Sequence, residues 1–449
     1  MTPNPPGNSP NRDPYDQPRT RYLALGLLMT AYVFNFIDRQ ILAILQEPIK
    51  AELSLSDTQL GLLTGFAFAV FYVVMGLPIA RWADRGNRRN IISLAVGVWS
   101  FFTAISGMVS SYVQLLLVRI GVGVGEAGCS PPSHSMLSDI FSRYERATAI
   151  GIYTVGVNIG ILLGFLAGGW LNEFFGWRIA FLAVGIPGVL LAIIIRVFLH
   201  EPRRGRTDEP SATDAGASQA DADQPSLMKV FATLWQLHTF RYMAVAAAFI
   251  AFAGYGLLNW LPSFFIRIHG LSTATVGTWF ALILGVGGGL GTWLVGYFSD
   301  RLGRRDERWY LWLTAISIAV YLPLLIGIFL VSNATAGLLL YIIPGVFLTT
   351  YLPPIIAVTH NLVPNRMRAM SSAVVYLILN LIGLGLGPVS IGFISDMLAP
   401  TMGNDGLRYA MLTVIPTAAV LGIVFLMLAA STIRRETAAH AANLNNKPA

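Results

Sequence analysis

Four ionisable residues lie inside long apolar runs of the sequence, where a charge is costly. Asp38 and Arg39 fall in the first run, and Arg119 and Glu126 fall in the fourth. A charged side chain at the centre of a membrane helix costs at least ~2.5–3.5 kcal/mol on insertion scales. Such residues indicate either a transport site or an ion-pair network that lets the helices insert and pack. Asp38 could also simply neutralise Arg39 near a helix end.

The spacing of the polar residues places them on two helical faces. Arg119 and Glu126 are seven residues apart, which is nearly two full turns, so they share one face. Tyr32, Asn35 and Arg39 follow one another at intervals of three and four residues and share another face. If these two faces meet, groups from both helices line a single site.

The chemistry of that site would be proton-linked binding of an anion. Two carboxylates and two guanidiniums sum to zero, so protonation of Asp38 or Glu126 leaves a net positive site. A guanidinium binds phosphate through paired donors, which favours Arg119 as the anchor, with Arg39 beside it. Phosphate and carboxylate could compete for arginine, which gives exchange against protons. Alternatively, protonation could free the arginine for substrate, which gives co-transport.

The second half of the sequence offers only uncharged candidates for this site. Asn259 and Asn380 are its best polar candidates, beside Tyr32 and Asn35 from the first half. The interiors of its apolar runs carry no charge, which leaves an apolar wall opposite the charged helices. An amphipathic substrate, with its head group on Arg119 and its tail along that wall, fits this asymmetry.

The composition places the chain in a membrane. Of the 449 residues, 55% are hydrophobic and only 12% are charged, and the mean hydropathy is +0.62. Soluble domains carry about 25% charged residues, so this chain does not have the composition of a soluble protein. The same composition excludes a disordered chain, a fibrous repeat and a disulfide scaffold. The formal charge of +7 and the pI of about 9.6 are more typical of cytoplasmic loops than of a nucleic-acid-binding face.

The sequence carries no signature of a cofactor, a metal site or an enzyme. Its histidines, carboxylates and single cysteine, Cys129, lack metal-ligand spacing. The run 123–128 matches the dinucleotide pattern G-x-G-x-x-G, but it lies inside an apolar run, where small residues permit close helix packing. No P-loop and no nucleophile with a nearby base stand out. An ion gradient therefore remains as the energy source.

Apolar runs of spanning length recur twelve times and predict an all-α membrane protein. Each is near 20 residues, enough to cross about 30 Å of hydrocarbon as a helix. The runs lie at about 22–45, 60–82, 90–110, 112–137, 147–170, 178–199, 241–266, 273–298, 309–331, 336–361, 369–394 and 407–431. The expected units are a disordered N-terminal tail (1–20), a six-helix half (21–199), a mobile cytoplasmic linker (200–226), a segment that could form an amphipathic surface helix (227–240), a second six-helix half (241–432) and a C-terminal tail (433–449).

The basic residues predict how the chain is oriented. Arginines and lysines gather in the tails, in the linker and in the loops on the linker's side, which include 81–89 and 301–308. The positive-inside rule places both termini and the linker in the cytoplasm. An even number of spans agrees with that orientation, and the short loops fit a bacterial inner membrane.

Two loops of the sequence repeat each other 216 residues apart. Asp84-Arg-Gly-Asn-Arg-Arg89 follows the second run, and Asp300-Arg-Leu-Gly-Arg-Arg305 follows the eighth. Two parallel six-helix halves joined by a cytoplasmic linker, with a cavity between them, are the plan of one transporter fold. The D-R-x-G-R-R loop, complete in the second copy, resembles the loop of the major facilitator superfamily. Asn87 replaces the usual loop glycine in the first copy, which affects only the geometry of that turn.

Further motifs resemble the Spinster branch of this superfamily. They are Phe34-Asn-Phe-Ile-Asp-Arg39, Arg119-Ile-Gly-Val-Gly-Val-Gly-Glu-Ala127, Ser130-Pro-Pro132, and Gly176-Trp-Arg178 with Phe181. The resemblance implies that the first and fourth helices both line the central cavity, so their charged faces meet. It also implies transport of sphingosine-1-phosphate or lysophospholipids, with proton coupling in some members.

The charged loops predict a gate at the cytoplasmic side. A carboxylate at a helix end can cap an N-terminus, and an arginine can bridge to a neighbouring helix. We therefore expect gating contacts, rather than substrate binding, from six loop residues: Asp84, Arg85, Arg88, Asp300, Arg301 and Arg304. The alternative is a plain topology signal of positive charge.

Together these features predict a monomeric secondary transporter with alternating access, without a cofactor, a metal or a nucleic-acid partner. Its substrate would be an anionic or zwitterionic amphipathic lipid, coupled to protons. A small organic anion or a drug-like cation is the alternative substrate. A lipid-modifying enzyme would need reactive residues gathered at one membrane face, and a non-transporting sensor would need a signalling domain in the linker.

Overall fold

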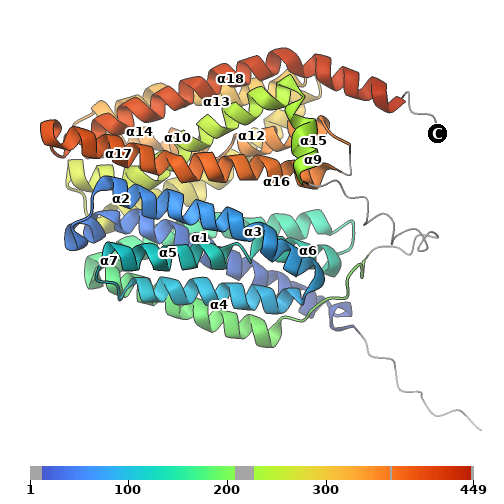
Figure 1. Ribbon diagram of the computed structural model, residues 1–449, viewed down its shortest axis with the longest axis horizontal. Helices are drawn as coiled ribbons and strands as arrows, with labels where there is room; N and C mark the ends of the chain where they lie inside the picture. Colours follow the sequence, from blue (N-terminus) through green and yellow to red (C-terminus); the bar gives the residue numbers. More distant parts are fainter. Residues whose placement is uncertain (1–12, 208–226, 365–366, 446–449) are drawn as a thin grey trace, which may run out of the picture.

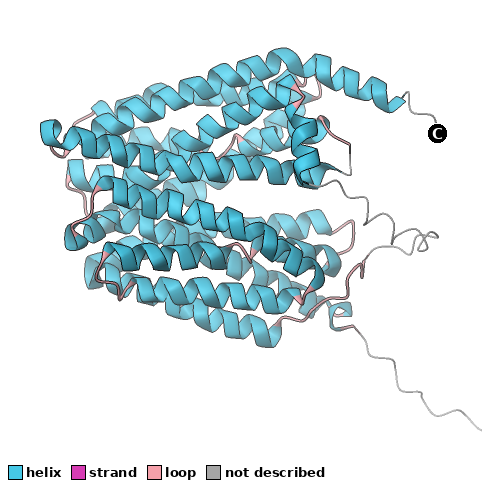
Figure 2. Ribbon diagram, viewed as in Figure 1, coloured by secondary structure: helices cyan, strands magenta, loops and turns pink. Residues whose placement is uncertain are grey.

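The computed structural model describes residues 13–207, 227–364 and 367–445, and within them it contains helices and loops but no strand (Figure 2). Eleven of the described helices are long and apolar enough to cross a membrane. One of these, α7 (Arg146–Phe198), is 53 residues long and breaks at Gly176, where φ is 82°. The break makes α7 two successive spans, so the twelve-helix plan is confirmed.

The N-terminal half begins with a short 3-10 turn and contains the first six spans. Its elements are η1 (Pro14–Asp16), α1 (Pro18–Leu53), α2 (Asp57–Gly61), a π-helical turn (Leu62–Phe66), α3 (Ala67–Arg85), α4 (Arg88–Ser106), α5 (Tyr112–Glu126), α6 (Ser130–Ile140) and α7. The second span consists of α2, the π-helical turn and α3, and the fourth consists of α5 and α6.

The C-terminal half repeats this plan after the linker. Its elements are α9 (Leu227–Trp235), α10 (His238–His269), α11 (Thr273–Phe280), a π-helical turn (Ala281–Gly287), α12 (Gly288–Gly303), α13 (Arg308–Leu330), α14 (Ala334–Phe347), α15 (Leu352–Asn361), α16 (Arg368–Ile378), a third π-helical turn (Leu379–Leu384), α17 (Gly385–Met402) and α18 (Asp405–Asn445). The third π-helical turn lies in the glycine-rich segment of the eleventh helix.

The two halves lie side by side and meet most closely at the end of the molecule away from the linker (Figure 1). There α2 packs against α17, and the C-terminal part of the first segment of α7 packs against α11. Glycines permit both contacts, since a Cβ on Gly61 would lie 2.6 Å from the carbonyl oxygen of Pro388, and one on Gly169 would lie 2.4 Å from that of Thr273. Toward the linker end, the ribbons of the two halves diverge (Figure 1).

Within the N-terminal half, a glycine stripe joins α7 to α1. The stripe comprises Gly156, Gly160, Gly164 and Gly168, and a Cβ on any of them would come within 3.0 Å of an α1 atom. Small residues at intervals of four permit close packing of membrane helices, and this stripe packs in that way. The close approach fixes α1, which carries two of the four charged residues of interest.

Several predicted boundaries differ from the structure. Residues 200–207 of the expected mobile linker pack against the N-terminal half, where Arg206 forms ion pairs with Asp13 and Asp16. Residues 13–20 of the expected N-terminal tail therefore have partners too, and the buried Tyr15 hydroxyl donates to the carbonyl of His200. Residues 1–12 and 208–226 lie outside the described residues. The expected C-terminal tail continues α18 as helix to Asn445.

The expected amphipathic segment forms the nine-residue helix α9, which ends at Trp235. It packs against α16 and buries Val230 and Leu234, whereas Met228 and Trp235 remain exposed. The next helix starts at His238, three residues before the expected boundary. Only part of the expected apolar face is therefore covered by protein.

Candidate functional site

The four charged residues of α1 and α5 come together in the interior of the N-terminal half. The Nε of Arg39 donates to Oε2 of Glu126 at 2.7 Å, which joins α1 to the end of α5. Asp38, Arg119 and Glu126 are each no more than 3% exposed. Asp38 lies in the middle of the 36-residue α1 rather than near a helix end, and no ion pair joins it to Arg39.

Aromatic rings hold the guanidinium of Arg39 in place. Its central carbon lies 5.0 Å from the ring centres of Phe68 and Tyr72 and 5.2 Å from that of Phe36. A cation over an aromatic face gains about 0.5–2 kcal/mol, and more when it is desolvated. The Arg39 side chain nevertheless remains 18% exposed, whereas that of Glu126 is fully buried. Arg39 is therefore positioned by the protein but accessible from outside it.

Several polar atoms around this pair have no hydrogen-bond partner among the described residues. They are Nδ2 of Asn35, Oδ1 of Asp38, Nε of Arg119 and Oε1 of Glu126. Arg119 interacts electrostatically with both carboxylates, and its guanidinium lies 5.6 Å from the ring centre of Phe68. Unsatisfied buried polar atoms are destabilising, so they mark places where a proton, water or ligand would gain hydrogen bonds.

The other predicted binding residues engage their own surroundings. Tyr32 stacks on Tyr153 with ring centres 4.4 Å apart. The side-chain amides of Asn259 and Asn380 each donate to a carbonyl one turn earlier in their own helices, at 2.9 Å. The Asn259 backbone carbonyl also accepts from Nε2 of Gln46 in α1, which makes it part of a contact between the halves.

The predicted gating residues of the first repeat fall into two groups. Asp84 and Arg85 are exposed, and their side chains make no hydrogen bond or ion pair within the described part of the chain, whereas Arg88 is only 1% exposed. Arg88 contacts Asp139 at 2.5 Å and Glu201 at 2.7 Å. The expectation that Asp84 caps a helix is wrong, because Asn87 caps α4 by accepting from the backbone N–H of Asn90.

The second repeat is more exposed than the first. Asp300 accepts from the Tyr310 hydroxyl at 3.1 Å, and Arg301 approaches Tyr297. The backbone N–H of Arg304, the counterpart of Arg88, donates to the Asp300 carbonyl, but its side chain makes no hydrogen bond or ion pair to any described residue.

The ionic contact in this region is made by Asp306. Arg434 in α18 pairs with it at 2.5 Å, and the backbone N–H of Arg308 donates to it. Desolvation opposes ionisation of Asp306, but these hydrogen bonds outweigh it and lower the pKa of this carboxyl. The loop carboxylate that holds α13 and α18 together is therefore Asp306, not Asp300.

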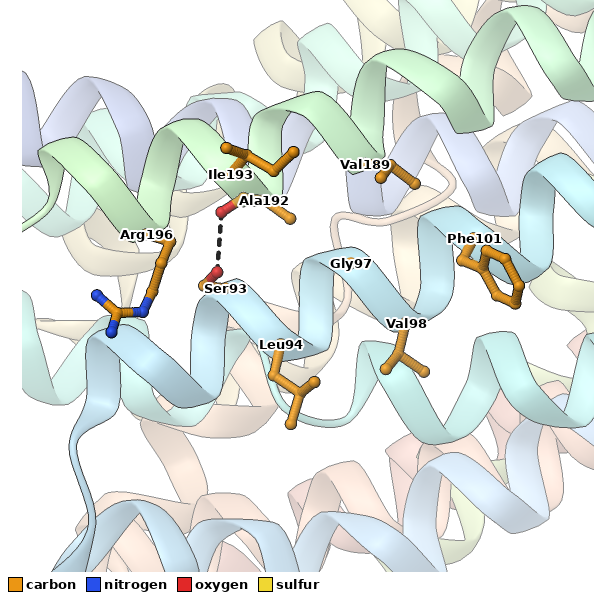
Figure 3. Close-up of a pocket in the computed structure, with 9 residues that line it drawn as sticks. All are labelled: Ser93, Leu94, Gly97, Val98, Phe101, Val189, Ala192, Ile193 and Arg196. Atoms are coloured by element: carbon orange, nitrogen blue, oxygen red, sulfur yellow. Dashed lines mark hydrogen bonds between the residues drawn. The ribbon is translucent and has the colours of Figure 1, made fainter.

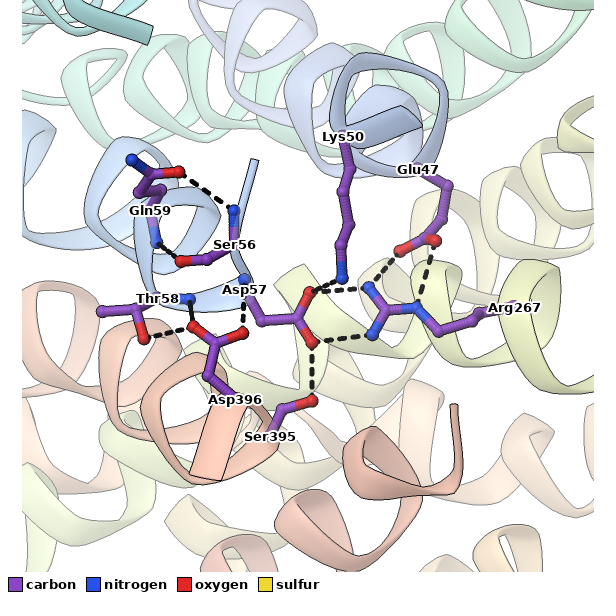
Figure 4. Close-up of polar contacts among 9 residues, drawn as sticks. All are labelled: Glu47, Lys50, Ser56, Asp57, Thr58, Gln59, Arg267, Ser395 and Asp396. Carbon is purple, nitrogen blue, oxygen red and sulfur yellow. Dashed lines mark hydrogen bonds and ion pairs between the residues drawn. The ribbon is translucent and has the colours of Figure 1, made fainter. Parts of the chain in front are cut away.

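An ion-pair network that the sequence interpretation missed joins the two halves (Figure 4), at the end of the molecule where α2 packs against α17. Arg267, near the end of α10, donates two hydrogen bonds to Asp57 at 2.7 and 2.8 Å. It donates two more to Glu47 at 2.7 and 3.1 Å. Lys50 reaches Asp57 at 2.5 Å from the other side. The Asp57 and Arg267 side chains are only 3% and 8% exposed, so the network is buried.

Asp396 of α17 makes a second set of contacts with these residues. We call the whole set the Arg267 network; it comprises Glu47, Lys50, Asp57, Thr58, Arg267, Ser395 and Asp396. It accepts from the backbone N–H groups of Asp57 and Thr58 at 2.9 and 2.7 Å, and from the Thr58 hydroxyl at 2.6 Å. Ser395 donates to Asp57 at 2.6 Å. A carboxylate at a helix N-terminus is favourable, so Asp396 of one half stabilises the start of α2 in the other. The hint in the sequence is that Lys50, Asp57, Arg267 and Asp396 all fall at the same membrane end of their helices.

The family of the chain follows from a match to the Major Facilitator Superfamily model over residues 28–388. The chain belongs to the major facilitator superfamily and is an integral, multi-pass membrane protein. The relatives described below are named as transporters, not as enzymes.

Three relatives carry more specific names. An MFS-type efflux pump of Mycolicibacterium smegmatis is 32% identical over 419 residues, which are 93% of this chain and 95% of that protein. A probable L-galactonate transporter of Escherichia coli is 30% identical over 286 residues, 63% of this chain and 62% of that one. The sphingosine-1-phosphate transporter SPNS2 of Danio rerio is 26% identical over 437 residues, 92% and 84% of the two chains.

A solved structure agrees with these relatives. The crystal structure of a bacterial homologue of the human lysosomal transporter Spinster, in an inward-facing and unoccupied conformation, has a TM-score of 0.80 to this chain. The two sequences are 32% identical over 94% of this chain and 98% of that one. The resemblance to the Spinster branch is therefore confirmed, and the chain is related both to Spinster and to sugar-acid transporters.

Proposed function

We propose that this protein is a proton-coupled secondary transporter that moves an anionic or zwitterionic single-chain lipid by alternating access. The observation that carries the proposal is the buried ion pair between Arg39 and Glu126, in which one partner is accessible and the other is not. Such a pair links two events, because the same carboxylate that binds a proton also occupies the arginine that would bind an anion.

The coupling follows from the charge on the pair. When Glu126 is ionised, the pair is neutral and Nε of Arg39 is occupied. When Glu126 is protonated, the pair carries one positive charge, and the guanidinium stays in place because Phe36, Phe68 and Tyr72 surround it. A phosphate or carboxylate can then take paired hydrogen bonds from it. Arg39, the more exposed of the two arginines, is therefore the proposed substrate anchor.

Arg119 and Asp38 have a supporting part in this scheme. Arg119 is 3% exposed and interacts electrostatically with both Asp38 and Glu126. It can stabilise whichever carboxylate is ionised while the other carries the proton. Asp38 is the second proposed proton carrier, since its Oδ1 is buried without a hydrogen-bond partner in the described chain.

The C-terminal half supports an amphipathic substrate. No Asp, Glu, Lys or Arg occurs in 242–266, 273–299, 309–330, 334–361, 370–395 or 409–433. The charged site of α1 and α5 therefore has no charged counterpart in the middle of the opposite half. An amphipathic substrate fits this difference between the halves, because its head group can bind Arg39 while its alkyl chain packs against the uncharged half. The relative named as a sphingosine-1-phosphate transporter supports an amphipathic substrate.

Alternating access is supported by the position of the Arg267 network. It holds α1, α2, α10 and α17 together at one end of the molecule, while the ribbons diverge at the other (Figures 1 and 4). With both termini and the linker in the cytoplasm, as we propose, the Arg267 network closes the outward side. The similarity to an inward-facing Spinster homologue supports that assignment. Outward opening would require these ion pairs to separate.

A small organic anion is the second candidate substrate. The relative named as a probable L-galactonate transporter favours it, and a protonated site with one positive charge suits a carboxylate as well as a phosphate. A lipid differs from such an anion in needing the apolar wall for its tail.

The experiment that tests the substrate class is uptake into proteoliposomes with an imposed pH gradient. Fluorescent lysophosphatidylcholine, sphingosine-1-phosphate and radiolabelled L-galactonate would be offered separately, with protein-free liposomes as the control. The proposal predicts that a lipid moves and that the pH gradient accelerates it. If galactonate moves and neither lipid does, the substrate is an organic anion and not a lipid. If none of the three moves, both proposed substrate classes are contradicted.

A further inference from the structure

A groove runs along the outer face of the N-terminal half between α4 and the second segment of α7 (Figure 3). Its volume is about 440 Å³. The residues that line it come only from these two helices: Ser93, Leu94, Gly97, Val98, Phe101, Val189, Ala192, Ile193 and Arg196. Leu94, Phe101 and Ile193 are each more than half exposed. The groove is therefore a lipid-facing feature separate from the site of α1 and α5.

Small residues form the floor of this groove. Ser93, Gly97 and Ala192 let the helices approach, and a Cβ on Gly97 would meet that of Ala192 at an ordinary 3.5 Å. The Ser93 hydroxyl donates to the Ala192 carbonyl at 2.8 Å, so it is satisfied within the protein. The floor thus offers no free hydrogen-bonding group, which suits a hydrocarbon chain. From Ser93 to Phe101 it runs along about 12 Å of helix.

Arg196 lies at one end of the groove, beside Ser93 (Figure 3). Its side chain is exposed and makes no hydrogen bond or ion pair to a described residue. It stands two residues before the end of α7 at Phe198, just before the linker. This position corresponds to the boundary between hydrocarbon and head groups, where a basic side chain meets the polar part of a lipid.

We propose that this groove is a binding site for an anionic phospholipid of the surrounding bilayer. One acyl chain lies along the floor between Leu94 and Ile193, and the phosphate accepts hydrogen bonds from Arg196. The free guanidinium at the mouth of an otherwise apolar groove selects an anionic head group over a zwitterionic one. Because only α4 and α7 of one half line the site, it stays intact when the halves move, and it does not depend on what the transporter carries.

Photolabelling in nanodiscs tests the site directly. Phosphatidylglycerol with a diazirine in its acyl chain would be compared with the matching phosphatidylcholine, and labelled peptides from 88–106 and 178–198 would be quantified. The native protein should be labelled by phosphatidylglycerol about fivefold more than by phosphatidylcholine, which corresponds to ~1 kcal/mol per basic residue near the surface. Inorganic phosphate should not reduce this labelling, because the acyl chain supplies part of the binding.

Two variants separate the head-group contact from the groove. Arg196→Gln should remove the preference for phosphatidylglycerol while labelling continues, and Gly97→Leu, which fills the floor, should reduce labelling by both lipids. Arg143→Gln removes an exposed charge elsewhere and should change neither result. Equal labelling of the native protein by the two lipids would overturn the proposal, as would an equal effect of Arg196→Gln and Arg143→Gln. Gly97→Ala is the control for Gly97→Leu, because its methyl group fits the available space. Normal labelling of Gly97→Ala would show that a change at this position does not by itself misfold the protein.

Discussion

Arg39 and Glu126 lie 87 residues apart in the chain, and only 2.7 Å separates Nε of the arginine from Oε2 of the glutamate. The glutamate is fully buried and the arginine is partly exposed, so proton and substrate would reach opposite members of the same pair. The proposed coupling does not need a long pathway, because the proton-binding group and the anion-binding group are in contact.

Arg39→Lys should weaken binding of the transported anion by about tenfold while keeping its pH dependence. Lysine keeps the positive charge but loses the planar group that lies among Phe36, Phe68 and Tyr72 and can bind phosphate with two donors. Equilibrium binding of the substrate identified in proteoliposomes would be measured at two pH values. Arg21→Lys, which alters a surface ion pair with Glu145, is the matched control and should leave binding unchanged. Native affinity in Arg39→Lys would contradict the role of the guanidinium.

Arg267→Gln should open the closed end of the molecule. The change leaves Asp57 and Glu47 buried with less compensation, and removing one member of a buried ion pair costs ~3–5 kcal/mol. Gln46, which is fully buried between the halves, provides a reporter when it is changed to cysteine in a Cys129→Ser background. A membrane-impermeant maleimide added on that side should label it at least about tenfold faster in Arg267→Gln.

The control for that experiment is Arg178→Gln on the same face. Arg178 pairs with Glu52, but both belong to the N-terminal half and both are substantially exposed. Its loss should not change the labelling rate at position 46. If both arginine variants label at the native rate, the Arg267 network does not hold the two halves closed.

Gly61→Ala should impair transport, whereas Gly76→Ala should not. A methyl group on Gly61 would lie 2.6 Å from the Pro388 carbonyl across the contact between the halves, and one on Gly76 would meet no atom within 4 Å. Overpacking of a tight contact costs ~1–3 kcal/mol, so the closed form is disfavoured in the first variant only. Initial transport rates and the amount of folded protein would be compared. Equal rates in the two variants would show that this close contact is not needed in the transport cycle.

Arg88→Met should lower the apparent melting temperature in detergent by several degrees, whereas Arg304→Met should have almost no effect. Arg88 is buried between Asp139 and Glu201, and its removal leaves two carboxylates without their partner, at ~3–5 kcal/mol. Arg304 holds the equivalent place in the second repeat but has no partner among the described residues. Similar shifts in both variants would mean that the two repeats are equally structural.

The fold and the N-terminal charges could be predicted because membrane burial penalises charge so strongly. Asp38, Arg39, Arg119 and Glu126 stand out in apolar runs, and the structure brings them together. The spans were also predictable from hydrophobic length. The break at Gly176 separates the fifth span from the sixth with almost no loop between them, so the number of crossings is the predicted one.

The Arg267 network could not be predicted in the same way, because its residues lie at helix ends, where charges are ordinary. Only the packing of α2 against α17 and of α1 against α10 buries Asp57 and Arg267. Arg88 shows the same limit, since the loop motif marks it as functional but its burial depends on Glu201, 113 residues away. Contacts between distant segments decide which of several similar charges become buried.

The central claim is tested most directly by measuring proton movement that is driven by substrate. Proteoliposomes containing a pH-sensitive dye would receive the transported substrate without any imposed pH gradient. The native protein, Glu126→Gln, Asp38→Asn and the surface control Glu145→Gln would be compared. We predict that substrate changes the internal pH with the native protein and with Glu145→Gln, but not with Glu126→Gln, which still binds the anion. A native-sized pH change in both Glu126→Gln and Asp38→Asn would contradict proton coupling through this site.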